Sequence, residues 1–322
     1  MGLLATALSY GPPVLRDKYS GSTIVPEAII AIEDQRSIIE IVPGEGDVRG
    51  VWVFSGDVYA FRNKSGGATA GMYKSTSTGW TEIDLGTALK FDGTTTDGEP
   101  VPGDSGTATT IVGATSGAQG DLAGISYHGN WETGAAGAMV LTNITGTFAD
   151  NENLTMSLLA YDSGSIEISE GANIAGATSG VTATVTSVTI STGTIAAGDA
   201  AGYISVKNNS GTWTDDEVIN INGVDHATVN GSSQPSSVVV AVADGTQYEQ
   251  TLQPGGTYEF TNYNFRGEST GISMYGVNTV DNGFSYDGTT FIKMYTGMDT
   301  DTPEHIAAHQ KHLFFSYPNG SI

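Results

Sequence analysis

The chain has 322 residues, with 12 basic and 35 acidic side chains and therefore a net charge of −23 at pH 7. A surface of that charge repels phosphate, which argues against non-specific nucleic-acid binding and against docking on an anionic membrane. The chain lacks cysteine, which excludes disulfides, thiolate zinc sites and cysteine nucleophiles. Its 44 glycines separate short apolar runs, and its 28 aromatic residues need burial, so the composition predicts an all-β protein rich in turns.

Residues 1–91 are predicted to form an N-terminal β segment followed by a first blade-like meander. Two β-rich runs lie at residues 24–32 and 37–42. From residue 49 onward, aromatic and β-branched residues alternate with tight turns and predict four consecutive antiparallel strands. Such a meander is typical of one blade of a propeller or one sheet of a sandwich.

Two tryptophans of this meander are predicted core residues. Trp52 and Trp80 each lie in a short strand with period-2 patterning beside a glycine turn. We expect both side chains to be buried inside the first blade.

Residues 92–250 have few aromatics and contain an internal repeat. The pentapeptide Gly-Ala-Thr-Ser-Gly at 113–117 recurs 63 residues later at 176–180. A Gly-Thr-aromatic triplet ending at Phe148 recurs 65 residues later and ends at Trp213. The repeat predicts two tandem small β modules, inserted as a unit into a loop of the platform, each with one aromatic plug.

Each repeat also carries an acidic turn, at residues 150–152 and 215–217. We expect these to be solvated turn residues, with calcium binding as the alternative in so acidic a chain.

Residues 251–322 are predicted to form a second blade-like meander and the start of a third. A helix is predicted over residues 302–312, because Thr302 is a suitable N-cap and Pro303 a suitable first residue. The apolar run that follows is expected to be an edge strand at a subunit or chain junction, with Phe314 and Phe315 as interface residues. The sequence ends inside this third hairpin, so we expect either more polypeptide or a neighbouring subunit to complete the sheet.

The candidate metal ligands lie in the same region. On the predicted helix, His305, His309 and His312 would share a face, but the glutamate that zincins place directly after the first histidine is missing. Asp299, Asp301 and Glu304 are weak calcium candidates, because the glycine and the distant glutamate of an EF-hand loop are missing. A solvated surface is the expected interpretation for both clusters.

The sequence gives no indication of catalysis. It contains no phosphate loop ending in Gly-Lys-Ser/Thr and no His-Glu pair of the zincin type. Paired carboxylates for a glycosidase occur by chance among 35 acidic residues. We therefore expect a protein that is not an enzyme and that needs no cofactor.

Four short segments stand out in the two meander regions: Tyr-Ala-Phe at 59–61, Met-Tyr-Lys-Ser at 72–75, Gly-Trp-Thr at 79–81, and a His-to-Ser segment at 305–316. These segments resemble tail proteins of tailed bacteriophages, in particular the β-propeller nozzle proteins of short-tailed phages. The resemblance covers residues 49–91 and 257–322, and the insert only loosely. Fewer than three blades can be counted, whereas a closed propeller needs at least about four.

The resemblance implies an all-β, propeller-like or sandwich platform interrupted by two tandem modules. It also implies a virion structural protein of the tail, assembled in the host cytoplasm as a ring homo-oligomer around the DNA exit channel. The expected partners are other tail proteins and passing DNA without sequence-specific contacts, with no membrane. The main alternative is a spike or adhesin module that binds host-surface glycan, and a lyase or glycosidase on the same platform is the third.

Overall fold

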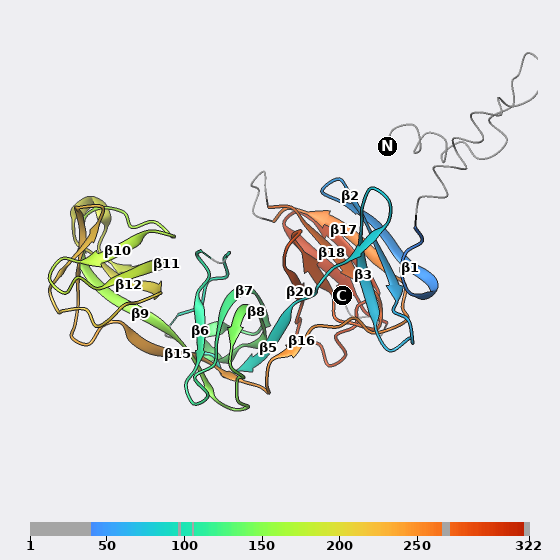
Figure 1. Ribbon diagram of the computed structural model, residues 1–322, viewed down its shortest axis with the longest axis horizontal. Coiled ribbons are helices and arrows are strands. Elements are labelled where there is room, and N and C mark those ends of the chain that lie inside the picture. The colour runs from blue at the N-terminus through green and yellow to red at the C-terminus, as the bar shows by residue number, and fades with distance from the viewer. Residues whose placement is uncertain (1–39, 96–97, 105, 266–270, 319–322) are drawn as a thin grey trace, which may run out of the picture. The chain divides into compact units, whose positions relative to one another are not determined.

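The computed structural model describes residues 40–318, except 96–97, 105 and 266–270, and this part of the chain is almost entirely β (Figure 1). Helix is limited in the described part to the four residues of α3 (Trp131–Gly134) and the 3-10 turn η2 (Ile195–Ala197). The all-β prediction is confirmed. The described chain divides into two units, one running to Ile83 and including Gln253–Gly255, the other comprising Asp84–Leu252 and the residues from Gly256 onward. The predicted β run at 24–32 and most of that at 37–42 lie outside the described residues.

The first unit is a four-stranded antiparallel meander. Its strands are β1 (Glu45–Phe54), β2 (Asp57–Asn63), β3 (Ala70–Ser75) and β4 (Trp80–Glu82), in that order across the sheet. The turn between β1 and β2 places Ser55 at φ 49° and Gly56 at φ 86°, as a type I′ hairpin requires. The four-strand prediction for this region is therefore correct.

The core of this meander differs from the expected one. Its fully buried large side chains are Phe54, Tyr59, Phe61, Met72 and Tyr73. Trp52 and Trp80 are only partly buried, so their placement in the core was wrong. Both tryptophans are in strands, but period-2 alternation does not show how completely each face of a four-stranded sheet is covered.

The second unit contains another four-stranded antiparallel meander and a hairpin. The meander strands are β17 (Glu259–Tyr263), β18 (Ser273–Val277), β19 (Phe284–Tyr286) and β20 (Phe291–Lys293). The hairpin is formed by β21 (His305–His309) and β22 (His312–Ser316). Phe284 and Phe291 stack at 4.9 Å between ring centroids and are both 1% exposed, so they form the centre of this meander's core.

The helix predicted over 302–312 is absent, because β21 and β22 occupy these residues. Ile306 pairs with Phe315 and Ala308 with Leu313, so one face of the hairpin is apolar. That alternation has period 2, and it overrides the helix-start signal of Thr302 and Pro303.

The insert is a twelve-stranded antiparallel assembly that closes on itself twice. Its twelve strands are β5 (Thr87–Asp92), β6 (Thr110–Gly113), β7 (Gln119–His128), β8 (Ala136–Thr145), β9 (Asn153–Gly164), β10 (Asn173–Gly176), β11 (Thr182–Thr192), β12 (Ala200–Lys207), β13 (Val218–Ile221), β14 (Val224–Val229), β15 (Ser236–Ala243) and β16 (Tyr248–Glu249). Strands β5-β8-β7-β6-β9-β15 form one closed ring, since β15 pairs back with β5. Strands β9-β12-β11-β10-β13-β14 form the other, since β14 pairs back with β9.

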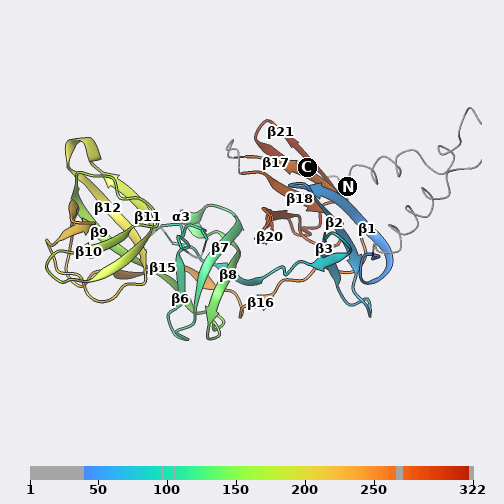
Figure 2. The ribbon, with the colours of Figure 1, turned by 45° about the horizontal axis from the view of Figure 1, so that its top comes forward.

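We call these rings the first module (β5–β8, the start of β9, and β15) and the second module (the end of β9, and β10–β14). Both contain β9, and β9 and β15 pass between them (Figures 1 and 2). Each module has its own hydrophobic cluster. Phe148 lies in the first cluster at 0% exposure and Trp213 in the second at 1%.

The second module lies within the sequence of the first. The chain leaves the first module along β9, builds the second module, and returns along β15. The tandem arrangement predicted from the repeat is therefore wrong, because the sixth strand of the first module comes after the whole of the second. Strand β5, which the sequence grouped with the first meander, pairs with β8 and β15 of the first module.

Candidate functional site

The most strongly organised polar sites are two buried glutamates, one in each module, held by the repeated Gly-Ala-Thr-Ser-Gly loops. We call them the glutamate clamps. In the first module, the Glu152 carboxylate accepts hydrogen bonds from the backbone N–H groups of Thr115 (3.0 Å), Ser116 (2.8 Å) and Ala149 (2.7 Å). It also accepts a 2.7 Å hydrogen bond from the Ser116 hydroxyl. All four donors come from loops, so the clamp ties the repeat loop to the turn before β9.

The second module repeats this arrangement atom for atom. The Glu217 carboxylate accepts from the N–H groups of Thr178 (3.1 Å), Ser179 (2.8 Å) and Thr214 (2.6 Å), and from the Ser179 hydroxyl at 2.8 Å. The two glutamates are only 4% and 3% exposed. The expectation that these acidic turns are solvated is thus wrong for Glu152 and Glu217.

The glycines of the pentapeptide explain why the loop has this sequence. A Cβ on Gly113 would lie 2.3 Å from Glu152 Oε1, so the carboxylate can approach only a glycine. The last glycine of each loop, Gly117 or Gly180, has φ +69°. That left-handed conformation turns the loop back so that its N–H groups face the carboxylate.

The clamps hold both carboxyl groups in the ionised form. Burial by itself raises the pKa of Glu152 and Glu217, but the hydrogen bonds outweigh it, and each pKa lies below its ordinary value. A carboxylate that already accepts four hydrogen bonds has no lone pair directed at a substrate or a metal ion. The chemistry of these sites is therefore the fixing of loops.

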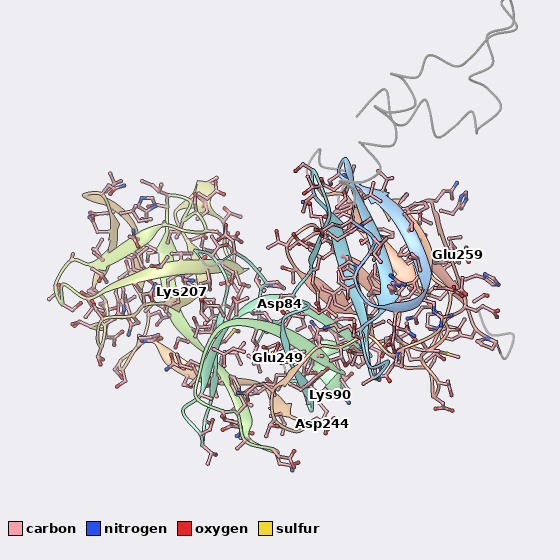
Figure 3. The ribbon with its side chains drawn as sticks, turned by 45° about the vertical axis from the view of Figure 1, so that its right-hand side comes forward. Asp84, Lys90, Lys207, Asp244, Glu249 and Glu259 are labelled. Atoms are coloured by element: carbon pink, nitrogen blue, oxygen red, sulfur yellow. The ribbon has the colours of Figure 1, made fainter. Side chains whose placement is uncertain are left out.

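A buried ion pair connects the two modules. Lys207, labelled in Figure 3, lies at the end of β12. Its Nζ is 3.8 Å from Asp121 Oδ2 in β7, and the two side chains are 5% and 16% exposed. Asp121 also accepts hydrogen bonds from Thr110 Oγ1 (2.8 Å) and Asn143 Nδ2 (3.0 Å). Lys207 was not identified from the sequence as a buried residue. The available signal was that a lysine is unusual in a module with so few basic residues.

The predicted metal candidates are used in other contacts or are exposed. The Asp301 carboxylate accepts from the Thr296 N–H and hydroxyl at 2.8 and 2.7 Å and from the Tyr317 hydroxyl at 3.0 Å. Asp299 and Glu304 are exposed. Within the described ranges, no group of three or more His, Asp or Glu side chains is arranged to hold a metal ion.

The three histidines lie on the hairpin rather than on a helix face. His309 and His312 are paired across its turn, and His305 lies at the far end of β21. His305 Nδ1 is 2.7 Å from Glu259 Oε2 on β17, and this hydrogen bond raises the pKa of the imidazole. All three side chains are exposed.

The predicted interface residues of this hairpin have different environments. Phe314 is 44% exposed, whereas Phe315 is partly buried, with its ring edge close to Gly283. Leu313 and Phe315 share the inner face, so Phe314 points to the opposite side. The rest of the predicted third hairpin, from residue 319 onward, lies outside the described residues.

One serine motif has strands on both sides of it. Residues 267–271 read Gly-Glu-Ser-Thr-Gly, which matches the Gly-x-Ser-x-Gly pattern of a nucleophile elbow. Residues 266–270 lie outside the described part of the chain. The flanking elements are the antiparallel strands β17 and β18, whereas a nucleophile elbow connects a strand to a helix.

Comparison with known proteins gives no relative from which a function could be transferred. No protein-family model, no curated protein and no solved structure matches this chain. Among the described residues, no helix has the length and apolar character needed to span a membrane.

Proposed function

We propose that this protein is a structural component of a bacteriophage tail that assembles into a ring around the DNA exit channel and catalyses no reaction. The proposal starts from the sequence resemblance to tail nozzle proteins in the two meander regions. Three features of the structure support it: the burial of the aromatic residues, the excess of acidic over basic charge, and an exposed apolar residue on the β21–β22 hairpin.

The observation that carries the proposal is the burial of the aromatic side chains inside the sheets. Those at most 2% exposed are Phe54, Tyr59, Phe61, Phe91, Phe148, Tyr161, Trp213, Phe284 and Phe291. Of the aromatic residues in the described ranges, only Tyr203 and Phe314 are more than 40% exposed, and they lie on β12 and β22. A glycan-binding module would instead need several aromatic faces exposed together in one groove.

Half of the eight lysine and arginine side chains in the described ranges form ion pairs within the chain. Four lysines pair with carboxylates: Lys64 with Glu82, Lys74 with Asp57, Lys207 with Asp121, and Lys293 with Asp281. What remains for a partner is a predominantly acidic surface. Such a surface lets DNA pass without the phosphate contacts that would retain it.

The terminal hairpin supports self-association. Among the described strands β22 pairs only with β21, and Phe314 lies on its outer face at 44% exposure. A strand of this kind gains stability when a neighbouring subunit adds a strand beside it and covers the aromatic ring.

Negative-stain electron microscopy of the purified 322-residue chain tests the proposal. We expect closed rings with a central opening, and we expect a Phe314→Asp variant to lose them while keeping its β-sheet circular dichroism. Single particles without rings at every concentration would contradict the proposal. Retention of the protein on bacterial surface glycans by such single particles would favour the adhesin alternative.

A further inference from the structure

Every strand pairing of the first module has a counterpart in the second. The β6–β7 pair Thr110↔Asp121 corresponds to Asn173↔Thr184 in β10–β11. The ladders of β7–β8 and β11–β12 even share a register shift at the same place, between Leu122 and Gly124 in one and between Val185 and Ser187 in the other. The two modules therefore have the same topology. The start of β9 is the fifth strand of the first module, and its end is the first strand of the second.

The correspondence identifies where the second module enters the first. The β9–β15 pair Met156↔Val238 corresponds to the β13–β14 pair Ile221↔Val224. Going away from these pairs, each ladder has one more pair, then a register shift, and then two further pairs. In the second module these two strands are joined by Asn222 and Gly223 alone, at φ 53° and 85°. In the first module the same connection contains the whole second module.

The core of the first module is built from its own strands, apart from Leu158 near the middle of β9 and the Lys207–Asp121 ion pair to the second module. Trp131 of α3 is 6% exposed and packs against Phe91 at 5.5 Å and Tyr127 at 5.3 Å between ring centroids. Its indole Nε1 donates a 3.2 Å hydrogen bond to the Gly98 carbonyl. Around Trp131 the core of the first module is therefore covered by that module's own residues.

We propose that the second module is a self-contained insertion in the fifth-to-sixth strand connection of the first, and that the Asn222–Gly223 turn is the equivalent acceptor site for a further folded module. Residues 222–224 are exposed, and Ile221 and Val224 are direct neighbours in an antiparallel pair. An inserted domain whose own termini lie close together can connect to two such neighbouring residues. The host module then loses little additional entropy on closing the enlarged loop. The proposal holds whether or not the protein belongs to a phage tail.

An excision variant tests the first half. Residues 157–237 are replaced by Asn-Gly, so that Met156 and Val238 are joined as Ile221 and Val224 are in the second module. We expect the shortened protein to unfold cooperatively and to keep slow hydrogen exchange at Thr115 and Ser116, whose N–H groups bond to Glu152. Fast exchange at these amides, or a chain that does not fold, would overturn the view that the second module is an insertion.

A pair of insertion variants of the full chain tests the second half. A small monomeric domain with adjacent termini is placed between Asn222 and Gly223, or, as the control, between Ser179 and Gly180 in the loop clamped by Glu217. The readouts are the hydrogen exchange of the Trp213 amide, whose N–H donates a 2.9 Å hydrogen bond to the Gln234 carbonyl, and the melting temperature.

We expect the 222/223 insertion to keep slow exchange at the Trp213 amide and to shift the melting temperature by less than about 5 °C. The 179/180 insertion should make this exchange fast, because it breaks the clamp. Equal effects of the two insertions, or loss of the second module from the 222/223 insertion, would overturn the acceptor-site assignment.

Discussion

The Tyr161 side chain is 2% exposed in the second module, and its hydroxyl has no hydrogen-bond partner among the described residues. Burial also raises the pKa of this phenol. Tyr161 pairs with Gly202 as Phe91 pairs with Gly137 in the first module, so the equivalent position there is a phenylalanine. The buried hydroxyl therefore costs stability that the first module does not lose.

Tyr161→Phe should accordingly stabilise the protein by about 1 kcal/mol, measured as a higher urea midpoint at an unchanged slope. The reciprocal Phe91→Tyr change is the matched control and should destabilise. A loss of stability in Tyr161→Phe would show that the hydroxyl is satisfied.

Glu217→Gln tests whether the clamps stabilise the modules. The amide removes the negative charge and puts an NH₂ group where the carboxylate oxygen accepts from backbone N–H groups, so we expect a loss of about 2–3 kcal/mol in the free energy of unfolding. Asp216→Asn changes the same charge one residue away at an exposed position and should have little effect. Equal effects of the two variants would contradict the structural role of the clamp.

The lowered pKa values of Glu152 and Glu217 determine how stability depends on pH. Between the folded and the unfolded pKa, the unfolded chain binds more protons, so stability rises with pH across that window. The contribution is complete above the unfolded pKa of about 4.3 and is lost as the pH falls through the folded values.

Urea unfolding at a series of pH values should therefore show stability falling below about pH 5, with a weaker fall in the Glu152→Gln/Glu217→Gln double variant. Parallel curves for the two proteins would show that other groups cause the acid sensitivity.

At the scale of single elements, the β21–β22 hairpin contains a turn that its residues do not favour. Gln310 and Lys311 lie at φ 44° and 66°, a left-handed conformation that suits Asn and Gly. Changing them to Asn and Gly should stabilise the hairpin by about 1 kcal/mol and raise the melting temperature. Ala308→Gly in β21 is the control and should lower it. Glycine at position 311 would destabilise a helix, so a lower melting temperature in the Asn-Gly variant would contradict the hairpin.

The strands of the meanders could be predicted from the sequence, because alternating apolar residues and tight turns are local signals. The hairpin at 305–316 could not, since Thr302 and Pro303 give a local helix-start signal that the pairing of Ile306 with Phe315 overrides. The burial of Trp52 and Trp80 depends on what covers each sheet face, which no local pattern records.

At the scale of the whole molecule, the duplication was visible in the sequence but its nesting was not. The offsets of the pentapeptide and the Gly-Thr-aromatic triplet show two copies, and a glutamate at a constant distance in both was the available sign of the clamps. Nesting depends on β15 pairing with β5 and β9 across the second module. Such long-range pairings leave no periodic trace in a single sequence.

We propose that the chain is an assembling structural protein, and its molar mass tests this directly. The measurement is light scattering of the 322-residue chain after size-exclusion chromatography. We expect a single species at a whole-number multiple of the 33.3 kDa chain, large enough to close a ring. A mass of one chain at every concentration would contradict it.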